Sequence, residues 1–248
     1  MTDGGDGPPV GGPGWAYFLD LDGTLIDFAD TPGDVRVDGD LRHLLEGLHH
    51  AAGGAVAIIT GRSLDDVDAL FSGIAFPVAG QHGLERRAAD GRLSRHPAPP
   101  GLDEARRVLT ADLDPRIEFE DKGLSLALHY RQAPTLGGYA GRLARRAAES
   151  AGPEYAVLSG KQIVELKPAG RDKGVAVREF LAEPPFQGRL PLFLGDDVTD
   201  EDGFASVNAL AGASIKVGAG PTVARWRLRD VRAVRAWMAR AIAAWRTP

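Results

Sequence analysis

The stretch Trp15-Ala-Tyr-Phe-Leu-Asp20-Leu-Asp22-Gly-Thr-Leu25 joins a short apolar run to two carboxylates, a glycine and a hydroxyl. A run of this length is typical of a strand that is buried on both faces of a parallel sheet. Asp20 and Asp22 are two residues apart, so their side chains point to the same side of an extended chain. An Asp-Gly turn after a strand is common. The complete pattern still favours a catalytic role, because open α/β sheets bind ligands where their strands end.

The composition limits the classes of function. The chain has 248 residues, of which 44% are hydrophobic and 25% charged, an ordinary mixture for one large or two modest globular domains. The net charge of −5 and the lack of a long basic run argue against nucleic acid or a membrane as partner. With 0 cysteines the chain has no thiolate chemistry, which fits a reducing compartment. We therefore expect a cytoplasmic monomer that acts on a small molecule.

The first part of the chain has the rhythm of a parallel α/β fold. After the opening strand, leucines at helical spacing follow Asp38 and end before Gly53-Gly54. The apolar strand Ala55–Thr60 comes next, followed by a helix over 63–71 and a short strand over 77–79. This βαβαβ order predicts a doubly wound parallel sheet.

The alternation of expected strands and helices stops after residue 84. Asp90-Gly91 lies between two short strand-like stretches and is a strong hairpin signal. The stretch Leu124–Tyr130 alternates apolar and polar residues, which suits a sheet with one solvated face. From Arg171 the α/β rhythm resumes. The sequence thus predicts a disordered Gly/Pro-rich leader over 1–14, an α/β core over 15–84 and 170–248, and an inserted α+β module over 85–169.

Polar groups follow three of the expected core strands. They are Asp20 with Asp22, Thr60, and Asp196 with its neighbour. A doubly wound sheet brings these strand ends to one edge. Two like charges about 4 Å apart cost about 4 kcal/mol at an effective dielectric constant of about 20, so this carboxylate cluster needs a cation. Ligands that are all oxygen favour Mg²⁺ over Zn²⁺.

The same residue types can perform phosphoryl transfer. A carboxylate beside Mg²⁺ is a workable nucleophile toward phosphorus, and a second carboxyl can serve as general acid and base. A hydroxyl and a lysine would complete the phosphate cradle. Thr60 supplies the hydroxyl, and Lys173 at an expected helix start supplies the lysine.

Four segments together resemble the motifs of the haloacid dehalogenase (HAD) superfamily of phosphatases. They are Asp20–Leu25, Thr60-Gly-Arg62, Lys173 and Gly195-Asp-Asp-x-x-Asp200. The resemblance implies a Rossmann-like core with an inserted cap of the C2 type. It also implies that Asp20 is the nucleophile and Asp22 the general acid and base. Mg²⁺ would be held by Asp20, the main-chain carbonyl of Asp22, and Asp196, with Asp200 as an accessory metal-site residue.

The inserted module narrows the resemblance to trehalose-6-phosphate phosphatases. The segments that carry it are Gly80-Gln-His-Gly83, Phe119–Arg131, Lys161 and Val164–Pro168. Gln81 is a departure, since members of that family commonly have an acidic residue there. The residues that would face the sugar by this resemblance are Gln81, His82, Glu120, Lys122, Lys161 and Glu165.

Two alternatives stay open at this point. A related capped phosphatase could act on another sugar phosphate, such as a sucrose or mannosyl phosphate. A phospho-accepting module similar to a response-regulator receiver also combines acidic residues, Mg²⁺, a threonine and a lysine on a parallel sheet. The Asp-x-Asp spacing at Asp20 and the inserted module argue against the receiver.

Overall fold

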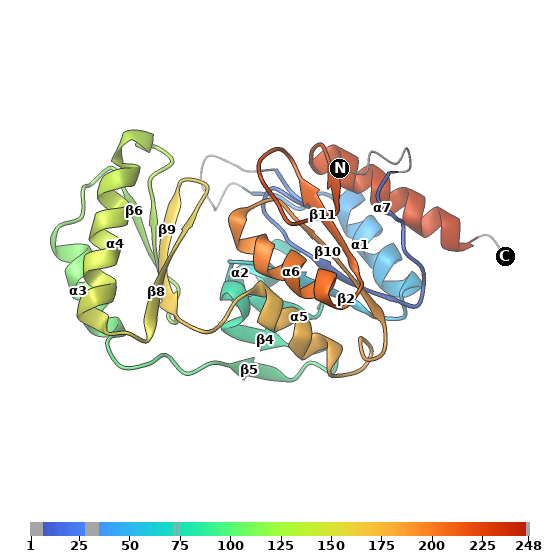
Figure 1. The fold of residues 1–248 in the computed structure, drawn as a ribbon, viewed down its shortest axis with the longest axis horizontal. Helices are drawn as coiled ribbons and strands as arrows, with labels where there is room; N and C mark the ends of the chain where they lie inside the picture. The colour runs from blue at the N-terminus through green and yellow to red at the C-terminus, as the bar shows by residue number, and fades with distance from the viewer. Residues whose placement is uncertain (1–6, 28–34, 72, 74, 247–248) are drawn as a thin grey trace. The chain divides into compact units, whose positions relative to one another are not determined.

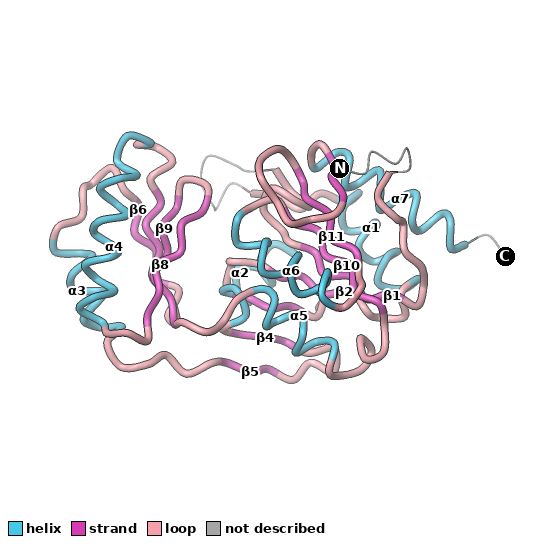
Figure 2. Tube along the Cα trace, viewed as in Figure 1, coloured by secondary structure: helices cyan, strands magenta, loops and turns pink. Residues whose placement is uncertain are grey.

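The computed structural model describes residues 7–27, 35–71, 73 and 75–246. The chain forms two compact units, which are described separately (Figures 1 and 2). Unit 1 consists of Met1–Ser94 and Asp172–Pro248, and unit 2 consists of Arg95–Arg171. Among the described residues, no helix combines the length and apolarity needed to cross a membrane.

Unit 1 is built on an eight-stranded sheet in the order β12-β11-β10-β1-β2-β3-β4-β5. Neighbouring strands are parallel from β12 to β3, and β4 pairs antiparallel with β3. The strands are β1 (Trp15–Leu19), β2 (Val56–Ile59), β3 (Val78–Gly80), β4 (Glu85–Arg87), β5 (Leu93–Arg95), β10 (Leu190–Gly195), β11 (Ala213–Val217) and β12 (Trp226–Leu228).

Helices cover both faces of this sheet, because successive strand side chains point to opposite sides. Tyr17 and Leu19 belong to a core cluster shared with helices α1, α2 and α7, whereas Ala16 and Phe18 belong to a cluster shared with α5 and α6 (Figure 1). The prediction of a doubly wound parallel sheet is therefore confirmed. The helices are α1 (Gly39–Ala51), α2 (Leu64–Phe71), α5 (Lys173–Leu181), α6 (Glu201–Ala209) and α7 (Val231–Arg246).

The boundary of the inserted module differs from the predicted one. The hairpin expected after residue 84 extends the sheet of unit 1, since β4 pairs with β3 in the register Ala79↔Arg86. The unit boundary consequently lies at Ser94/Arg95, and the return crossing lies at Arg171/Asp172. A turn signal in the sequence does not reveal which sheet the hairpin joins, because main-chain hydrogen bonds with a distant strand make that choice.

Unit 2 is a four-stranded antiparallel sheet in the order β6-β7-β9-β8, covered on one face by two helices. Leu126 and Leu128 point into the core shared with these helices, while the neighbouring position 127 belongs to the opposite face. The elements are α3 (Leu102–Ala111), β6 (Glu118–Asp121), β7 (Leu126–His129), α4 (Gly137–Ala151), β8 (Tyr155–Gly160) and β9 (Ile163–Pro168).

The prediction of a disordered leader is wrong for residues 9–13. The indole of Trp237 donates a hydrogen bond to the carbonyl of Pro9 at 3.1 Å, and that of Trp245 donates to the carbonyl of Gly11 at 3.2 Å. The Tyr17 hydroxyl donates to the carbonyl of Gly12 at 3.0 Å. The Gly/Pro-rich composition of this segment offers little to a hydrophobic core. Its main-chain carbonyls nevertheless accept hydrogen bonds from aromatic side chains elsewhere in the chain. The predicted leader residues 1–6 lie outside the described part of the chain.

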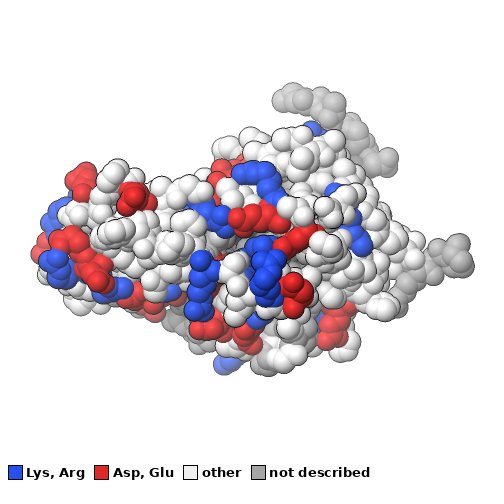
Figure 3. All heavy atoms as spheres, turned by 90° about the horizontal axis from the view of Figure 1, so that it is seen from below, with Lys and Arg blue, Asp and Glu red and all other residues white. Residues whose placement is uncertain are grey.

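Charged side chains of both signs lie next to each other on the face of the molecule drawn in Figure 3. Ion pairs also join elements of unit 1. The guanidinium of Arg87 on β4 contacts both oxygens of Asp68 on α2, at 2.8 and 2.7 Å. Arg86, on the same strand, pairs with Glu183 and lies 4.8 Å from the centre of the Phe180 ring.

The start of α1 offers a test of local stabilisation. Asp38 accepts a hydrogen bond from the Leu41 amide at 2.8 Å and pairs with Arg235 of α7 at 2.6 Å. We expect Asp38→Ala to lower the free energy of unfolding by about 1 kcal/mol, the usual value of an N-cap. Asp38→Asn should cost less, because an asparagine oxygen can still cap. Urea unfolding measures both; equal losses would contradict the capping role.

The pKa of Asp38 also determines in which direction the stability of the folded protein changes with pH. The ion pair with Arg235, followed by the bond from Leu41, holds the pKa of Asp38 below its usual value. A lowered folded-state pKa adds stability above the unfolded-state pKa of about 3.9, and this contribution disappears as the pH falls through the folded-state value. The difference between wild type and Asp38→Ala should therefore shrink below about pH 4.

Candidate active site

The ends of three neighbouring strands define the candidate site in unit 1. Leu19, the last residue of β1, is level with Leu194 of β10 and Ile58 of β2 in the parallel register. The amide of Asp20 continues this pairing, donating to the carbonyl of Leu194 at 2.9 Å. Asp20, Asp196 and Thr60 consequently follow their strands at one edge of the sheet, as the sequence predicts.

A buried ion cluster lies at this edge. The Lys173 ammonium donates to Oδ1 of Asp20 and to Oδ1 of Asp200, at 2.6 Å each. Carboxylate oxygens of Asp20, Asp196 and Asp200 lie within 4.8 Å of one another. All four residues are buried, with at most 4% of their surface exposed. The ammonium thus contacts two carboxylates of a buried group of three.

Two local structures place the lysine and the nearby main chain. Asp172 caps α5 by accepting a hydrogen bond from the Val175 amide at 2.7 Å, which fixes Lys173 in the first turn of that helix. At Gly195 a Cβ atom would lie 2.2 Å from Cγ of Asp200, so this position has no room for a larger side chain. The glycine before Asp196 is therefore required by packing.

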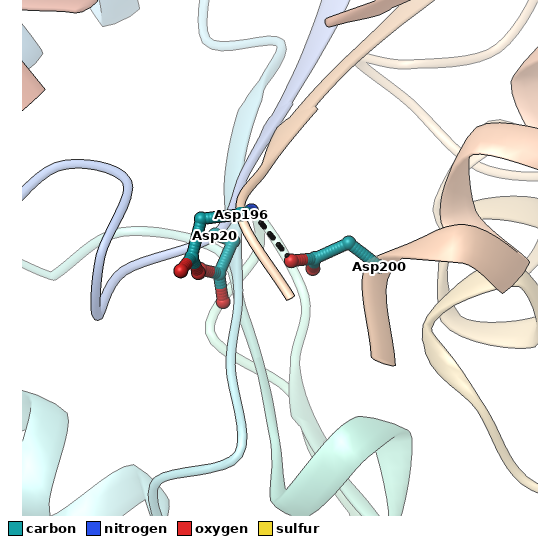
Figure 4. Close-up of side chains that lie close together, drawn as sticks. All are labelled: Asp20, Asp196 and Asp200. Atoms are coloured by element: carbon teal, nitrogen blue, oxygen red, sulfur yellow. Dashed lines mark hydrogen bonds between the residues drawn. The ribbon is translucent and has the colours of Figure 1, made fainter. Parts of the chain in front are cut away.

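Asp200 differs from the other two carboxylates in its direction of approach. Its Oδ2 accepts hydrogen bonds from the amides of Asp196 and Asp197, at 2.8 and 2.9 Å. In Figure 4 the carboxylates of Asp20 and Asp196 lie close together, while that of Asp200 reaches the main chain of Asp196 from the other side. Asp200 thus holds the loop after β10 and the ammonium of Lys173 at the same time.

The electrostatics of the cluster reflect this crowding. Burial, and then the charge of Asp200, raise the pKa of the Asp20 carboxyl well above its usual value. Burial alone would lower the pKa of Lys173, but the charges of Asp20 and Asp200 outweigh it and raise that pKa above its ordinary value. The cluster therefore keeps its ammonium and has an excess of negative charge that a divalent cation would balance.

The remaining predicted catalytic residues lie beside this cluster. Thr60 is buried, and its hydroxyl accepts a hydrogen bond from the Arg62 amide at 3.2 Å. The Asp22 carboxylate is bound by the guanidinium of Arg62, through two contacts of 2.7 Å. The geometry thus assigns Asp22 a partner different from that of Asp20, although the two side chains are two residues apart.

Three residues of the site were not singled out from the sequence. The hydroxyl of Thr24 donates to Oδ2 of Asp20 at 3.0 Å, and the position of Thr24 within the Asp20–Leu25 motif was an available signal. Arg62 directly follows Thr60-Gly61. Lys216 of β11, almost completely buried, lies 3.4 Å from the carbonyl of Asp197. Nothing in the sequence around Lys216 indicates that contact.

Gln81 and His82 lie in a short 3₁₀ turn that packs against the Thr60 loop. The amide of His82 donates to the carbonyl of Thr60 at 2.9 Å, and a Cβ atom at Gly61 would lie 2.8 Å from the His82 ring. The side-chain amide of Gln81 donates to Glu85 at 3.2 Å, and only 2% of Gln81 is exposed. The contact with Glu85 holds the Gln81 side chain in place, and the contact of Gln81 with a sugar stays a prediction.

Three of the predicted sugar-binding residues come together in unit 2. Glu120 and Glu165 lie in one row across the sheet, each level with Ala127. The Lys122 ammonium is 3.8 Å from Glu120 and 3.7 Å from Glu165. Lys161 lies in the exposed turn between β8 and β9.

Side chains next to this row fix its carboxylates. The hydroxyl of Ser125 donates to Glu165 at 2.6 Å, and Nε2 of His129 lies 2.7 Å from Glu120. Burial works to raise the pKa of Glu120, but the contact with His129 and the charge of Lys122 outweigh it and hold that pKa below its usual value. The face of this sheet opposite its two helices therefore carries fixed acceptors and an ammonium donor.

Two known proteins are similar to the chain over most of its length. The trehalose-6-phosphate phosphatase of Escherichia coli (strain K12) is 44% identical over 230 residues, which are 90% of this chain and 85% of that protein. A probable trehalose-phosphate phosphatase of Sinorhizobium fredii is 45% identical over 206 residues, 82% of this chain and 78% of that protein.

Solved structures show the same fold. The C-terminal domain of the Candida albicans trehalose-6-phosphate phosphatase has a TM-score of 0.84 at 20% identity, covering 94% of this chain and 93% of that chain. A HAD-superfamily phosphatase from Bacteroides thetaiotaomicron has a TM-score of 0.60 at 17% identity, covering 92% and 95%. The predicted HAD fold is thereby confirmed. The sequence model of the family described as trehalose-phosphatase matches residues 18–232, and the chain therefore belongs to this family.

Proposed function

We propose that the chain is a Mg²⁺-dependent phosphatase that hydrolyses trehalose 6-phosphate to trehalose and phosphate. The observation that carries this proposal is the buried cluster of Asp20, Lys173, Asp196 and Asp200 at the edge of the sheet, in a chain whose family match extends over 18–232. Family membership supports the trehalose phosphate as substrate. It also favours a phosphatase over the receiver-like alternative.

In the first step, an oxygen of Asp20 attacks phosphorus and the bond from phosphorus to the sugar oxygen breaks. A protonated Asp22 gives its proton to the departing oxygen, so trehalose leaves as the neutral alcohol. The phosphoryl group stays on Asp20 as an aspartyl phosphate. Lys173, hydrogen-bonded to Asp20, orients the attacking carboxylate, and Thr60 offers its hydroxyl to the phosphoryl oxygens.

In the second step, water attacks the phosphorus of the aspartyl phosphate. The carboxylate of Asp22 takes a proton from this water, and the bond between phosphorus and the Asp20 oxygen breaks. Inorganic phosphate leaves and both carboxyl groups return to their starting states. The same carboxyl thus acts as acid in one step and as base in the next.

The donor set of the cluster fits Mg²⁺. Its ligands are oxygens, and its carboxylates outnumber the single ammonium, as a hard divalent cation requires. Asp20 and Asp196 would hold the ion through carboxylates and Asp22 through its main-chain carbonyl, with Asp200 supporting the loop behind them. When bound, the ion neutralises the phosphoryl oxygens as a Lewis acid.

Unit 2 would provide sugar recognition, as a cap of the C2 type. Sugar hydroxyls both donate and accept hydrogen bonds, and the row formed by Glu120, Lys122 and Glu165 supplies both kinds of partner. His82 and the exposed Lys161 are further proposed contacts. The enzyme would work as a monomer in the cytoplasm, without nucleic acid or membrane partners; the 0 cysteines support a reducing compartment.

Phosphate release from a panel of sugar phosphates tests the function. We expect trehalose 6-phosphate to be the preferred ester over sucrose and mannosyl phosphates, and we expect EDTA to abolish release until Mg²⁺ is restored. Release that is unaffected by the chelator would remove the metal from the proposal. A much faster reaction with another sugar phosphate would replace the substrate.

The nucleophile can be tested by trapping. Asp20→Asn should lower kcat by about 10⁴-fold or more, because an amide cannot form the acyl phosphate. Acid quenching during turnover of ³²P-labelled substrate should retain label on wild type and not on the variant. Thermal unfolding checks that the variant is folded. Substantial residual turnover, or label on the variant, would exclude Asp20 as nucleophile.

Sugar recognition by unit 2 has a selective test. Lys122→Ala removes a charged donor, which is worth about 1.5–3 kcal/mol, so kcat/KM for trehalose 6-phosphate should fall about 10- to 100-fold. Hydrolysis of p-nitrophenyl phosphate should change little. Arg116→Ala, which removes an exposed charge of unit 2 paired with Asp114, is the matched control and should affect neither ester. Equal losses on both esters in Lys122→Ala would place Lys122 outside the sugar site.

A further inference from the structure

The side chain of Asp22 is held at two points by one residue. Nε of Arg62 donates to Oδ2 of Asp22 and Nη2 donates to Oδ1, both at 2.7 Å. The side chains of Arg62 and Asp22 are 15% and 26% exposed, so this pair is not a loose surface contact. A planar guanidinium fork that grips both carboxylate oxygens fixes the orientation of the carboxylate as well as its position.

Arg62 is itself fixed by its main chain. Its amide donates to the hydroxyl of Thr60 at 3.2 Å, and its carbonyl accepts from the amide of Gln81 at 2.8 Å. The His82 ring packs against the intervening Gly61 so closely that a Cβ atom there would lie 2.8 Å from it. The loop after β2 is therefore a rigid support for the guanidinium, and through it for a side chain 40 residues away in sequence.

We propose that Arg62 is a positioning residue that acts through Asp22, setting the carboxyl group in place for proton transfer to the leaving oxygen. This inference rests on the proposed function, in which Asp22 is the general acid and base. Proton transfer depends on geometry, and a displacement of about 1 Å can cost about 100-fold in rate. Arg62 needs no contact with the substrate for this role.

The leaving group separates this role from a structural one. A sugar alkoxide needs a proton as it departs, whereas p-nitrophenolate leaves without one. In single-turnover experiments with excess enzyme, which report formation of the aspartyl phosphate, Arg62→Gln should slow trehalose 6-phosphate about 10- to 100-fold and p-nitrophenyl phosphate by less than about 3-fold. Equal slowing of both esters would overturn the inference. In steady-state measurements, a rise in KM with kcat unchanged would also overturn it, because that result indicates direct binding of the substrate by Arg62.

A double-mutant cycle tests the route through Asp22. In an Asp22→Asn background, Arg62→Gln should cause no further loss with trehalose 6-phosphate, because its partner no longer transfers protons. Additive losses would overturn the inference. Arg62→Lys keeps the charge without the two-point grip, so it should recover only part of the rate; full recovery would show that charge, and not orientation, is what matters.

The chain contains a matched control. Arg87 makes the same two-point contact with Asp68 in unit 1, at 2.8 and 2.7 Å, away from the edge with the cluster. Arg87→Gln should leave both rates unchanged, and an equal loss in the two variants would assign the effect to a loosened fold. If Asp22→Asn itself shows no dependence on the leaving group, the role of Asp22 in the proposed function fails. If the loss in Asp22→Asn depends on the leaving group and the loss in Arg62→Gln does not, only the role of Arg62 fails.

Discussion

One buried ammonium holds the site of unit 1 together. Lys173 lies between Asp20 and Asp200, and removing an ion from water costs several kcal/mol unless it is well paired. The surrounding elements meet this requirement: β1 delivers Asp20, the capped start of α5 delivers the lysine, and Asp200 also binds the main chain after β10. Loss of the ammonium would leave Asp20 and Asp200 without the cation that they share, so the positions of both carboxylates depend on Lys173.

The two units divide the proposed work. The residues assigned to phosphoryl transfer all belong to unit 1, on loops that follow parallel strands. The residues assigned to the sugar lie mostly on the polar face of the unit 2 sheet, where the Lys122 ammonium lies 3.8 Å from Glu120 and 3.7 Å from Glu165. In the proposed function, chemistry common to many phosphate esters would rest on the buried charge cluster, and selectivity would rest on a separate polar row with its own supports, Ser125 and His129.

Sequence patterns predicted the core of unit 1 because burial and catalysis both leave local signals. The apolar run before Asp20 and the glycine before Asp196 have direct structural causes: a two-sided core and the side chain of Asp200. The hairpin before Ser94 was assigned to the wrong unit, and the segment at Pro9 was taken as disordered. Both depend on main-chain contacts with distant elements, which no local pattern records. The grip of Arg62 on Asp22, across 40 residues, was invisible for the same reason.

Successive side chains on the strands of unit 2 point to opposite faces of the sheet, so the two faces meet different requirements. Leu126 and Leu128 support the helices, while Ala127 and the charged residues level with it face the other way. Under the proposed function, a substitution on the polar face would alter recognition without creating a cavity in the core. Under the proposed function, substitutions at these polar positions would change the sugar substrate at little cost in folding, whereas the buried charges of unit 1 depend on one another and leave little room for change.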